Sequence, residues 1–449
     1  MLYCLGKKLL SKWGIKLQVT SYNEALAFIH GRRKFTKSPD LERMKKFAHY
    51  LGDPQKKTKF IHVTGTNGKG STVAFLARLL HEQGFSVGTF TSPFITQFNE
   101  RISIDFHQIS DEELVELVNE VIPVVKRLDD EYNGEGPKEF EVVTMLMFLY
   151  FAKKRPDYAV VEVGIGGTYD STNILMPEIS VITEVALDHT QILGETLSEI
   201  ANAKAGIIKE KRPVVVGKLA RKSLEIIKEV AKKNDAKLYQ AKKDFNAVAK
   251  SNVKPWEEIF EYQGFGIDET FEINLLGTYQ IENASLALST FLVLAKKEGF
   301  RPIIDQIKSA LKKTTWPGRF EKISSKPLIV LDGAHNEDAV QKLVKTLKER
   351  FATQKIYVIA SILADKSSNQ MRTLLEELPN VELLNVDFDA PRQVSHPDQK
   401  SYENWRDALS EVLAKISSGE LLLFTGSLYF ISEVRNYWRE KDGSKISDL

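Results

Sequence analysis

The alternation of apolar and polar positions along the chain predicts a fold class before any motif is considered. From about residue 60, short apolar runs rich in β-branched residues are separated by segments whose apolar residues recur at helical spacing. This alternation favours an α/β fold with a mostly parallel sheet covered by helices on both faces. The expected strands are 60–64, 86–90, 158–163, 179–184 and 213–217, and the expected helices are 38–51, 71–83, 111–128, 139–154 and 196–208.

The pattern changes between about residues 236 and 278, where polar and apolar positions alternate in short stretches. Examples are "IFEYQGFG" and "TFEINLLG", which predict a small antiparallel ribbon. A helix is expected at 280–298, and Pro317 with Gly318 then interrupt the pattern. A second series of strands and helices begins with "PLIVLDGAHN" and continues through "KIYVIASI", "VELLNVDF" and "LLLFTGS". We therefore place a domain boundary near residues 315–318.

The composition is typical of a globular protein with two domains. A chain of 449 residues exceeds what one hydrophobic core usually supports. The net charge of +2 gives no support for a nucleic-acid or membrane partner. The single cysteine, Cys4, excludes an intrachain disulfide and fits a reducing compartment. No apolar run reaches membrane-spanning length, and the first residues make a poor signal peptide. We expect a cytoplasmic protein that is a monomer.

The stretch "FIHVTGTNGKGSTVAF" (60–75) predicts a phosphate-binding loop between a strand and a helix. Gly65, Gly68 and Gly70 allow backbone N–H groups to point inward at a helix N-terminus, and Lys69 adds a positive charge. An ordinary P-loop carries Ser or Thr after its lysine, because that hydroxyl binds Mg²⁺, but Gly70 stands here. The loop is therefore a variant, and a glycine-rich turn without a ligand is the alternative.

Polar residues follow two other predicted strands. Glu162 ends the apolar run in "DYAVVEVGIGG", and Glu184, Asp188 and His189 follow the run in "ISVITEVALDH". Open α/β sheets bind ligands beyond the carboxyl ends of their strands, where carboxylates beside a P-loop suit the Mg²⁺ of a nucleotide. Singly, Glu162 could be a strand-end residue and His189 a loop histidine.

Eight short motifs occur in the order that one known family shows. They are "VTGTNGKGS", "TFTSPFITQFNERI", "EVGIGGTYDSTN", "TEVALDHTQILG", "KAGIIK", "GRFEKI", "DGAHN" and "TGSLY". Together they resemble the folylpolyglutamate synthases, a family that includes dihydrofolate synthases and belongs to the Mur ligase superfamily of ATP-dependent amide ligases. The resemblance runs from about residue 21 to about 436. It implies an N-terminal extension (1–20), an ATP-binding P-loop domain of the Mur ligase central type (21–316) and a C-terminal Rossmann-like α/β domain of the Mur ligase type (317–449).

The resemblance also implies where the metal binds. In this family the residue after the P-loop lysine is glycine, and a serine of the "TSP" segment is a metal ligand instead. The implied ligands of Mg²⁺ are Ser92, Glu162 and His189. Without the resemblance, Ser92 beside Pro93 would be assigned to a turn or a helix cap.

Further site residues follow from the same resemblance. The implied ATP contacts of the P-loop are Thr66, Asn67, Gly68, Lys69, Gly70 and Ser71, and those of the second half are Asn283, Arg319 and Asp332. The expected catalytic residues also include Lys69 and Lys204, of which Lys204 corresponds to a lysine that is carbamylated in the superfamily. His335 is close enough to Asp332 in the sequence to reach the same crevice, so we expect a catalytic or phosphate-contact role for it. On the residues alone, His335 could serve helix capping, Asp332 a loop and Asn336 a helix cap, and Lys204 would lie on a surface.

The implied reaction is the ATP-dependent addition of L-glutamate to the γ-carboxylate of a folate or folylpolyglutamate through an acyl phosphate. One alternative is dihydrofolate synthase activity, in which dihydropteroate accepts the first glutamate. A second is a P-loop switch protein, but no NKxD guanine-reading motif occurs and such a protein would leave "DGAHN" unexplained. A Mur-type cell-wall ligase would need a nucleotide-sugar-binding domain before the P-loop, where only 59 residues precede the first strand.

Overall fold

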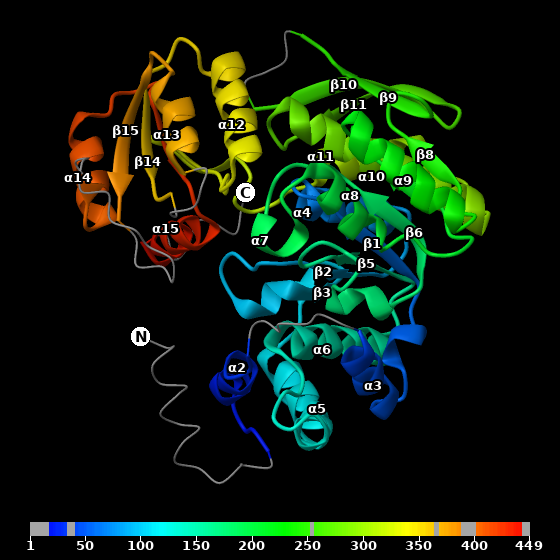
Figure 1. The fold of residues 1–449 in the computed structure, drawn as a ribbon. Coiled ribbons are helices and arrows are strands. Elements are labelled where there is room, and N and C mark those ends of the chain that lie inside the picture. Colours follow the sequence, from blue (N-terminus) through cyan, green and yellow to red (C-terminus); the bar gives the residue numbers. More distant parts are fainter. Residues whose placement is uncertain (1–17, 34–40, 252–255, 363–367, 388–400, 442–449) are drawn as a thin grey trace. The chain divides into compact units, whose positions relative to one another are not determined.

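The computed structural model describes residues 18–33, 41–251, 256–362, 368–387 and 401–441, and the chain divides into two compact units. Unit 1 is Met1–Ser92, Phe98–Phe245 and Leu286–Ile307, and unit 2 is Pro93–Gln97, Asn246–Ser285 and Lys308–Leu449. Each unit contains a mostly parallel sheet with helices, which confirms the predicted α/β class (Figure 1). The domain boundary at 316/317 and the N-terminal extension stay predictions; residues 1–17 lie outside the described residues.

Unit 1 is built on an eight-stranded sheet with the order β4-β3-β2-β5-β1-β6-β7-β8. The strands from β2 to β8 in that order pair in parallel, and β3 and β4 extend the sheet in antiparallel pairing. The bounds are β1 Phe60–Thr64, β2 Val87–Phe90, β3 Ile102–Ile104, β4 His107–Gln108, β5 Tyr158–Glu162, β6 Pro177–Ile182, β7 Val214–Val216 and β8 Leu238–Gln240. All five strands predicted for this region are confirmed.

The predicted ribbon is present but begins later than expected. Leu238–Gln240 pair in parallel with Val214–Val216 and form the edge strand of the large sheet. The sequence pattern did not separate this strand from the ribbon, because three residues are too few to show a clear alternation. The ribbon is a separate three-stranded sheet with the order β11-β10-β9. Its strands are β9 Phe245–Ala249, β10 Glu258–Gly264 and β11 Ile267–Ile273, and β10 and β11 pair antiparallel.

Helices pack on both sides of the unit 1 sheet. Figure 1 shows α4 and α6 on opposite sides of β1 and β5. The helix α6 is buried along most of its length, because α5 and α3 cover its outer side. The helices are α2 Tyr22–His30, α3 Glu42–Tyr50, α4 Lys69–Glu82, α5 Asp111–Glu131, α6 Glu139–Lys154, α7 Thr190–Leu193, α8 Leu197–Ala205 and α9 Arg221–Lys233, with 3-10 turns at Pro54–Lys56, Phe98–Arg101 and Ser171–Ile174. The predicted helices are confirmed, although residues 38–40 of the first lie outside the described residues.

Two helices run across the division between the units. They are α10 Thr278–Glu298 and α11 Ile304–Lys313. The first confirms the helix predicted at 280–298.

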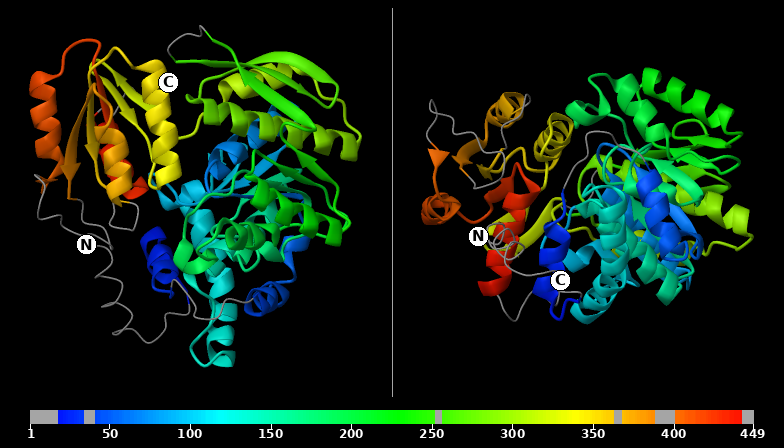
Figure 2. Two further views of the ribbon diagram at one scale, coloured as in Figure 1. Left: turned by 45° about the horizontal axis from the view of Figure 1, so that its top comes forward. Right: turned by 60° about the horizontal axis from the view of Figure 1, so that its bottom comes forward.

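Unit 2 contains a six-stranded sheet with the order β12-β13-β17-β14-β15-β16, in which only β12 pairs antiparallel. Alternate strand residues enter two cores: Val330 and Val358 pack with α12 and α13 on one face, while Ile329 and Ile359 pack with α14 and α15 on the other (Figure 2). The bounds are β12 Glu321–Ser325, β13 Leu328–Leu331, α12 Glu337–Arg350, β14 Ile356–Ala360, α13 Ser368–Glu376, β15 Val381–Val386, β16 Ser401–Tyr402, α14 Trp405–Lys415, β17 Leu421–Thr425 and α15 Leu428–Lys441. The second βα series is therefore confirmed.

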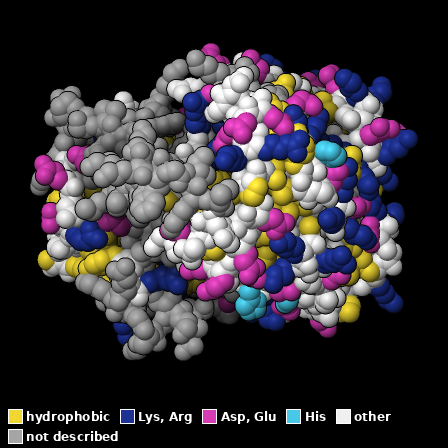
Figure 3. Space-filling model, turned by 90° about the horizontal axis from the view of Figure 1, so that it is seen from below, with side chains coloured by type: hydrophobic (Ala, Val, Ile, Leu, Met, Phe, Trp, Pro, Cys, Tyr) yellow, Lys and Arg dark blue, Asp and Glu magenta, His cyan; other side chains and the backbone are white. Residues whose placement is uncertain are grey.

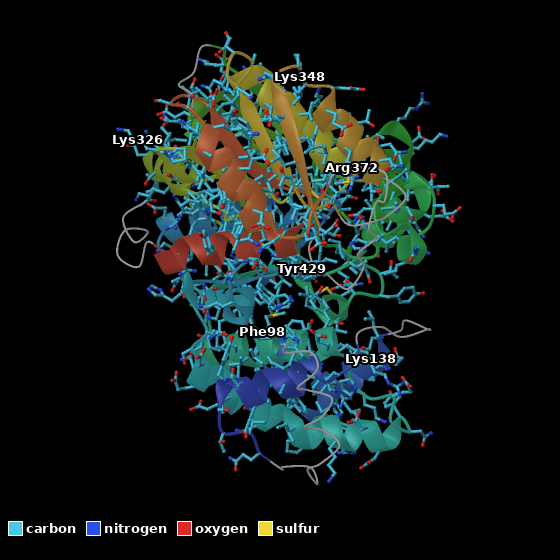
Figure 4. All side chains as sticks on the ribbon, turned by 90° about the vertical axis from the view of Figure 1, so that its left-hand side faces the viewer. Phe98, Lys138, Lys326, Lys348, Arg372 and Tyr429 are labelled. Carbon is cyan, nitrogen blue, oxygen red and sulfur yellow. The ribbon has the colours of Figure 1, made fainter. Side chains whose placement is uncertain are left out.

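The two ends of the parallel strands in unit 2 can be followed in Figure 4. Lys348 marks the last turn of α12 near the amino ends of the strands, and Tyr429 marks the first turn of α15 near their carboxyl ends. On the described part of the face in Figure 3, lysine and arginine side chains are interspersed with aspartate and glutamate. No helix among the described residues is long and apolar enough to cross a membrane.

Candidate active site

The predicted P-loop has the backbone conformation of a phosphate cradle. β1 ends at Thr64 and α4 begins at Lys69, with Gly68 at φ 80° as the residue before the helix. That left-handed conformation is readily adopted by glycine, and it places a helix N-terminus behind the loop. The Lys69 ammonium donates hydrogen bonds to the carbonyl oxygens of Gly65 at 3.0 Å and Thr66 at 3.1 Å. The positive charge therefore lies directly over the loop.

The end of β6 braces the P-loop from the neighbouring strand. The Thr66 N–H donates to the Glu184 carbonyl at 2.9 Å, and the Thr183 hydroxyl donates to the Asn67 carbonyl at 2.6 Å. A Cβ on Gly65 would lie 1.7 Å from Thr183 Oγ1, so only glycine allows this approach. Sequence reasoning missed Thr183, although a polar residue ending an apolar strand was the available signal. These contacts hold the P-loop backbone against the residues that follow β6.

Parallel strands carry the predicted metal ligands to one edge of the sheet. Ser92 follows β2, Glu162 ends β5 and His189 follows β6, and the order β2-β5-β1-β6 places the P-loop between Glu162 and the His189 loop. The Ser92 N–H donates to Glu162 Oε2 at 3.1 Å, and the Glu162 side chain is buried. The structure thus joins Ser92 to Glu162.

His189 occupies a strained position at the start of α7. Its φ is 48° and its carbonyl accepts from the Ile192 and Leu193 N–H groups, while the ring is exposed. No group of three or more His, Cys, Asp or Glu side chains among the described residues forms a metal site. Only Glu162 and His189 of the predicted ligands are of those types, so this observation does not test the Mg²⁺ site. The site stays a prediction. Its hydroxyl, carboxylate and imidazole donors nevertheless fit Mg²⁺.

Lys204 lies inside the protein, in the last turn of α8, so the surface alternative for this residue is wrong. Its exposed fraction is 3%. Burial, together with the nearby charge of Lys69, lowers the pKa of Lys204 to about 7, although Asp188 and Glu184 act in the opposite direction. A lysine with this pKa is about half amine at pH 7, and the amine is the form that reacts with carbon dioxide.

The predicted ATP contacts of the second half share one neighbourhood in unit 2. Tyr279 lies one turn before Asn283 in α10, and its pKa is raised by burial and by the charge of Asp332, with Arg319 acting in the opposite direction. Asn283 is buried and donates to Gln280 Oε1 at 3.0 Å. The helix that carries Asn283 is therefore close to Asp332 and Arg319.

Asp332 has a structural role beside its predicted one. Its two carboxylate oxygens accept from the Phe320 and Ala334 N–H groups, each at 2.9 Å, and burial raises its pKa. These bonds tie the Arg319 turn to the end of β13. His335 is exposed, and its Nδ1 lies 2.9 Å from the Gly333 carbonyl. Asn336 caps α12 by accepting from the Ala339 N–H at 2.9 Å, which confirms the capping alternative for that residue.

Family models match both halves of the chain. The Mur ligase middle domain matches residues 63–291, and the Mur ligase glutamate ligase domain matches residues 318–428. The chain is 42% identical over 428 residues to a dihydrofolate synthase/folylpolyglutamate synthase of Bacillus subtilis, which covers 93% of this chain and 99% of that relative.

Solved structures agree over the same length. A folylpolyglutamate synthase in complex with AMPPCP and folate is 39% identical to this chain, with a TM-score of 0.85. The superposition covers 93% of this chain and 99% of that synthase. A Mycobacterium tuberculosis folylpolyglutamate synthase complexed with ADP is 27% identical, with a TM-score of 0.86, and covers 93% and 98%. The chain therefore belongs to the folylpolyglutamate synthase and dihydrofolate synthase family of Mur-type ligases.

Proposed function

We propose that this protein adds L-glutamate to the γ-carboxylate of tetrahydrofolate or of a folylpolyglutamate, with cleavage of ATP to ADP and phosphate, in the cytoplasm. The observation that carries the proposal is the full-length similarity to a folylpolyglutamate synthase whose complex holds both an ATP analogue and folate. The braced P-loop with glycine after its lysine agrees with it. A single cysteine in the whole chain supports the reducing compartment.

The chemistry needs two successive transfers. A γ-carboxylate oxygen attacks the γ-phosphorus of ATP, the bond from that phosphorus to the β–γ bridging oxygen breaks, and ADP leaves. The α-amine of glutamate then attacks the acyl carbon, loses a proton and expels phosphate to form the amide. The first step brings two anions together, so the N–H groups of the P-loop and the Lys69 ammonium lower its barrier by offsetting charge.

Ser92, Glu162 and His189 would hold Mg²⁺ at the strand ends beside the P-loop. Bound there, the ion would supply positive charge to the phosphate oxygens of ATP. Glu162 would contribute its carboxylate, and the backbone N–H of Ser92 orients that carboxylate. In unit 2, Asn283, Arg319 and Asp332 would contact ATP, and His335 would act in catalysis.

Dihydrofolate synthase activity is the second candidate function. The Bacillus subtilis relative carries both activities in its name, at 42% identity. In that reaction the acceptor is the carboxylate of dihydropteroate, and the chain would use the same P-loop and lysine. A protein with both activities would accept either pterin.

The proposal predicts that turnover requires ATP, Mg²⁺, L-glutamate and a pterin acceptor together. ADP release should fall to a small background when glutamate or the pterin is omitted, because the acyl phosphate cannot form or cannot be consumed. Parallel assays with tetrahydrofolate and dihydropteroate, read by ADP release and by the mass of the pterin product, separate the two candidate functions. Rapid ATP hydrolysis that neither pterin nor glutamate affects would instead indicate a simple nucleotide hydrolase.

The metal assignment predicts a difference between two serines. Ser92→Ala keeps the backbone N–H that binds Glu162 and removes only the hydroxyl. The Mg²⁺ concentration for half-maximal activity should therefore rise by roughly tenfold or more, in the range seen when metal sites lose a supporting group. Ser71→Ala, which removes a hydroxyl buried in α4, is the matched control and should change it less. The reverse ranking in a Mg²⁺ titration would make Ser71 the ligand.

A further inference from the structure

The carboxyl end of α8 is held by one short segment that follows β5. α8 ends at Ala205, so carbonyl groups of its last turn lack partners within the helix. The Ala203 carbonyl accepts from the Thr168 N–H at 2.8 Å and from the Thr168 hydroxyl at 3.0 Å. The Gly206 carbonyl accepts from Asn173 Nδ2 at 3.1 Å. Both donors belong to the segment 167–173, so this segment satisfies carbonyls on either side of Lys204.

Asn173 also closes the segment on itself. Its Nδ2 donates to the Thr168 carbonyl at 3.0 Å, so one amide nitrogen connects Thr168 to Gly206. The Asn173 side chain is buried, and the backbone N–H of Asn173 donates to the Asp170 carbonyl at 2.8 Å. We call Thr168 and Asn173 the α8 latch.

The contact between the latch and α8 is too close for side chains at two positions. A Cβ on Gly167 would lie 2.8 Å from the Ala203 oxygen and 3.0 Å from the Lys204 oxygen. A Cβ on Gly206 would lie 2.1 Å from Thr168 Oγ1 and 2.5 Å from Thr168 Cα. Both glycines therefore serve close approach of two backbones, which is typical of a contact whose geometry is fixed.

The latch also connects Lys204 to the end of β5. Glu162 is the last residue of β5, and the chain passes from it through a glycine-rich turn to Thr168. The Thr64 hydroxyl, at the end of β1, donates to the Gly166 carbonyl at 2.5 Å and anchors this turn. Lys204 therefore has a fixed position relative to Glu162 and to the strand that leads into the P-loop.

We propose that Thr168 and Asn173 are positioning residues that hold the backbone of Lys204 so that its side chain enters the active site as a carbamate. The inference rests on the proposed function and on the carbamylation of Lys204 that the family resemblance implies. A lysine side chain has four rotatable bonds along its carbon stem. The position of its amine therefore depends on how firmly its backbone is held. A displacement of about 1 Å in a catalytic group can lower a rate by roughly a hundredfold.

The test compares two latch variants with a matched control. Thr168→Val removes the hydroxyl donor but keeps the backbone N–H, and Asn173→Asp replaces the donating nitrogen by an oxygen that faces two carbonyls. Thr290→Val is the control, because the Thr290 hydroxyl is buried and donates to the Leu286 carbonyl at 2.8 Å within α10. Each protein is titrated with ¹³C-bicarbonate, and the carbamate carbon signal and the rate of glutamate incorporation are measured.

The bicarbonate concentration for half-maximal carbamate signal should rise by roughly fivefold in Thr168→Val, the effect of one lost hydrogen bond, and further in Asn173→Asp. Glutamate incorporation should follow the same concentration dependence, and the KM for ATP should stay unchanged. Thr290→Val should match the wild type in the bicarbonate titration. If Asn173→Asp does not fold, Thr168→Val carries the test.

Latch variants with wild-type bicarbonate titrations would overturn the inference, even if their melting temperatures fall. A wild type without a carbamate signal would overturn the inference together with the modification of Lys204. Glutamate incorporation by that wild type would still leave the proposed ligase function standing, so the two failures are distinguishable.

Discussion

Replacing Lys69 by alanine should lower kcat by at least about a hundredfold, as expected when a preorganised charge is removed from the transition state. Its ammonium donates to the P-loop carbonyls of Gly65 and Thr66, where charge would build up in the proposed attack on ATP. Glu162→Ala should have an effect of similar size, because it removes the buried carboxylate that we propose as a Mg²⁺ ligand at the end of β5. Steady-state rates of ADP release at saturating substrates measure both effects.

The matched control for Lys69 is Lys57→Ala. Lys57 is exposed and lies before the other end of β1, so its removal takes away an equal charge far from the P-loop. Melting curves should be nearly unchanged for Lys57→Ala and Lys69→Ala, since neither side chain belongs to the hydrophobic core. A Lys69→Ala protein that melts and turns over normally would remove Lys69 from the site.

Lys204→Ala and Lys204→Arg should both lose most activity. In the proposed carbamylation, the amine of buried Lys204 would attack the carbon of carbon dioxide and form an N–C bond. One oxygen would take the electron pair of a C=O bond, and the nitrogen would release a proton to solvent. The product is an anion, whereas arginine stays a cation beside Lys69 and repels Mg²⁺. ¹³C-bicarbonate should give a carbamate signal in the wild type that is absent from Lys204→Ala.

The low pKa of Lys204 would give the proposed carbamylation a pH dependence. The pKa is lowered to about 7, so the reactive amine fraction grows as the pH rises through 7. At a fixed concentration of dissolved carbon dioxide, the initial rate of carbamate formation should therefore be higher at pH 8 than at pH 6.

Lys211→Ala is the control for the loss of activity in the Lys204 variants, because the Lys211 side chain is 72% exposed. Lys209 is unsuitable, since it donates to the Asn173 carbonyl at 3.1 Å. Full activity in Lys204→Arg would show that no carbamate is needed.

Local pattern was sufficient to predict most of the fold. The strands at 60–64 and 158–163 are buried apolar runs, and such runs with helical segments between them have few solutions other than a parallel sheet. The pattern was insufficient for β8, where three residues carry too little periodicity. It also could not predict that residues 93–97 group with unit 2, because that depends on contacts between segments distant in the chain.

The candidate site was predictable to the extent that its residues carry charge at strand ends. Glu162 follows from that rule, and the P-loop follows from its glycines and Lys69, whereas Ser92 and Lys204 required the family resemblance. Thr168 and Asn173 escaped because their roles are hydrogen bonds to backbone carbonyls of another element, which no local sequence pattern records. Thr183 carried a local signal as a polar residue after an apolar strand, but its bond to the Asn67 carbonyl depends on the tertiary structure. The burial of Lys204 is likewise a tertiary property, since its helix reads as an ordinary amphipathic segment.

The proposed acyl-phosphate mechanism can be tested by following an oxygen label from the acceptor carboxylate into the released phosphate. A tetrahydrofolate or dihydropteroate acceptor labelled with ¹⁸O in its reacting carboxylate is incubated with ATP, Mg²⁺, L-glutamate and the protein. Mass spectrometry then measures the pterin product and the released phosphate. We expect one glutamate added per ATP cleaved and one ¹⁸O atom in each phosphate, because the carboxylate oxygen that attacked phosphorus leaves with it. Glutamate addition with unlabelled phosphate, or phosphate release without a lengthened product, would contradict this mechanism.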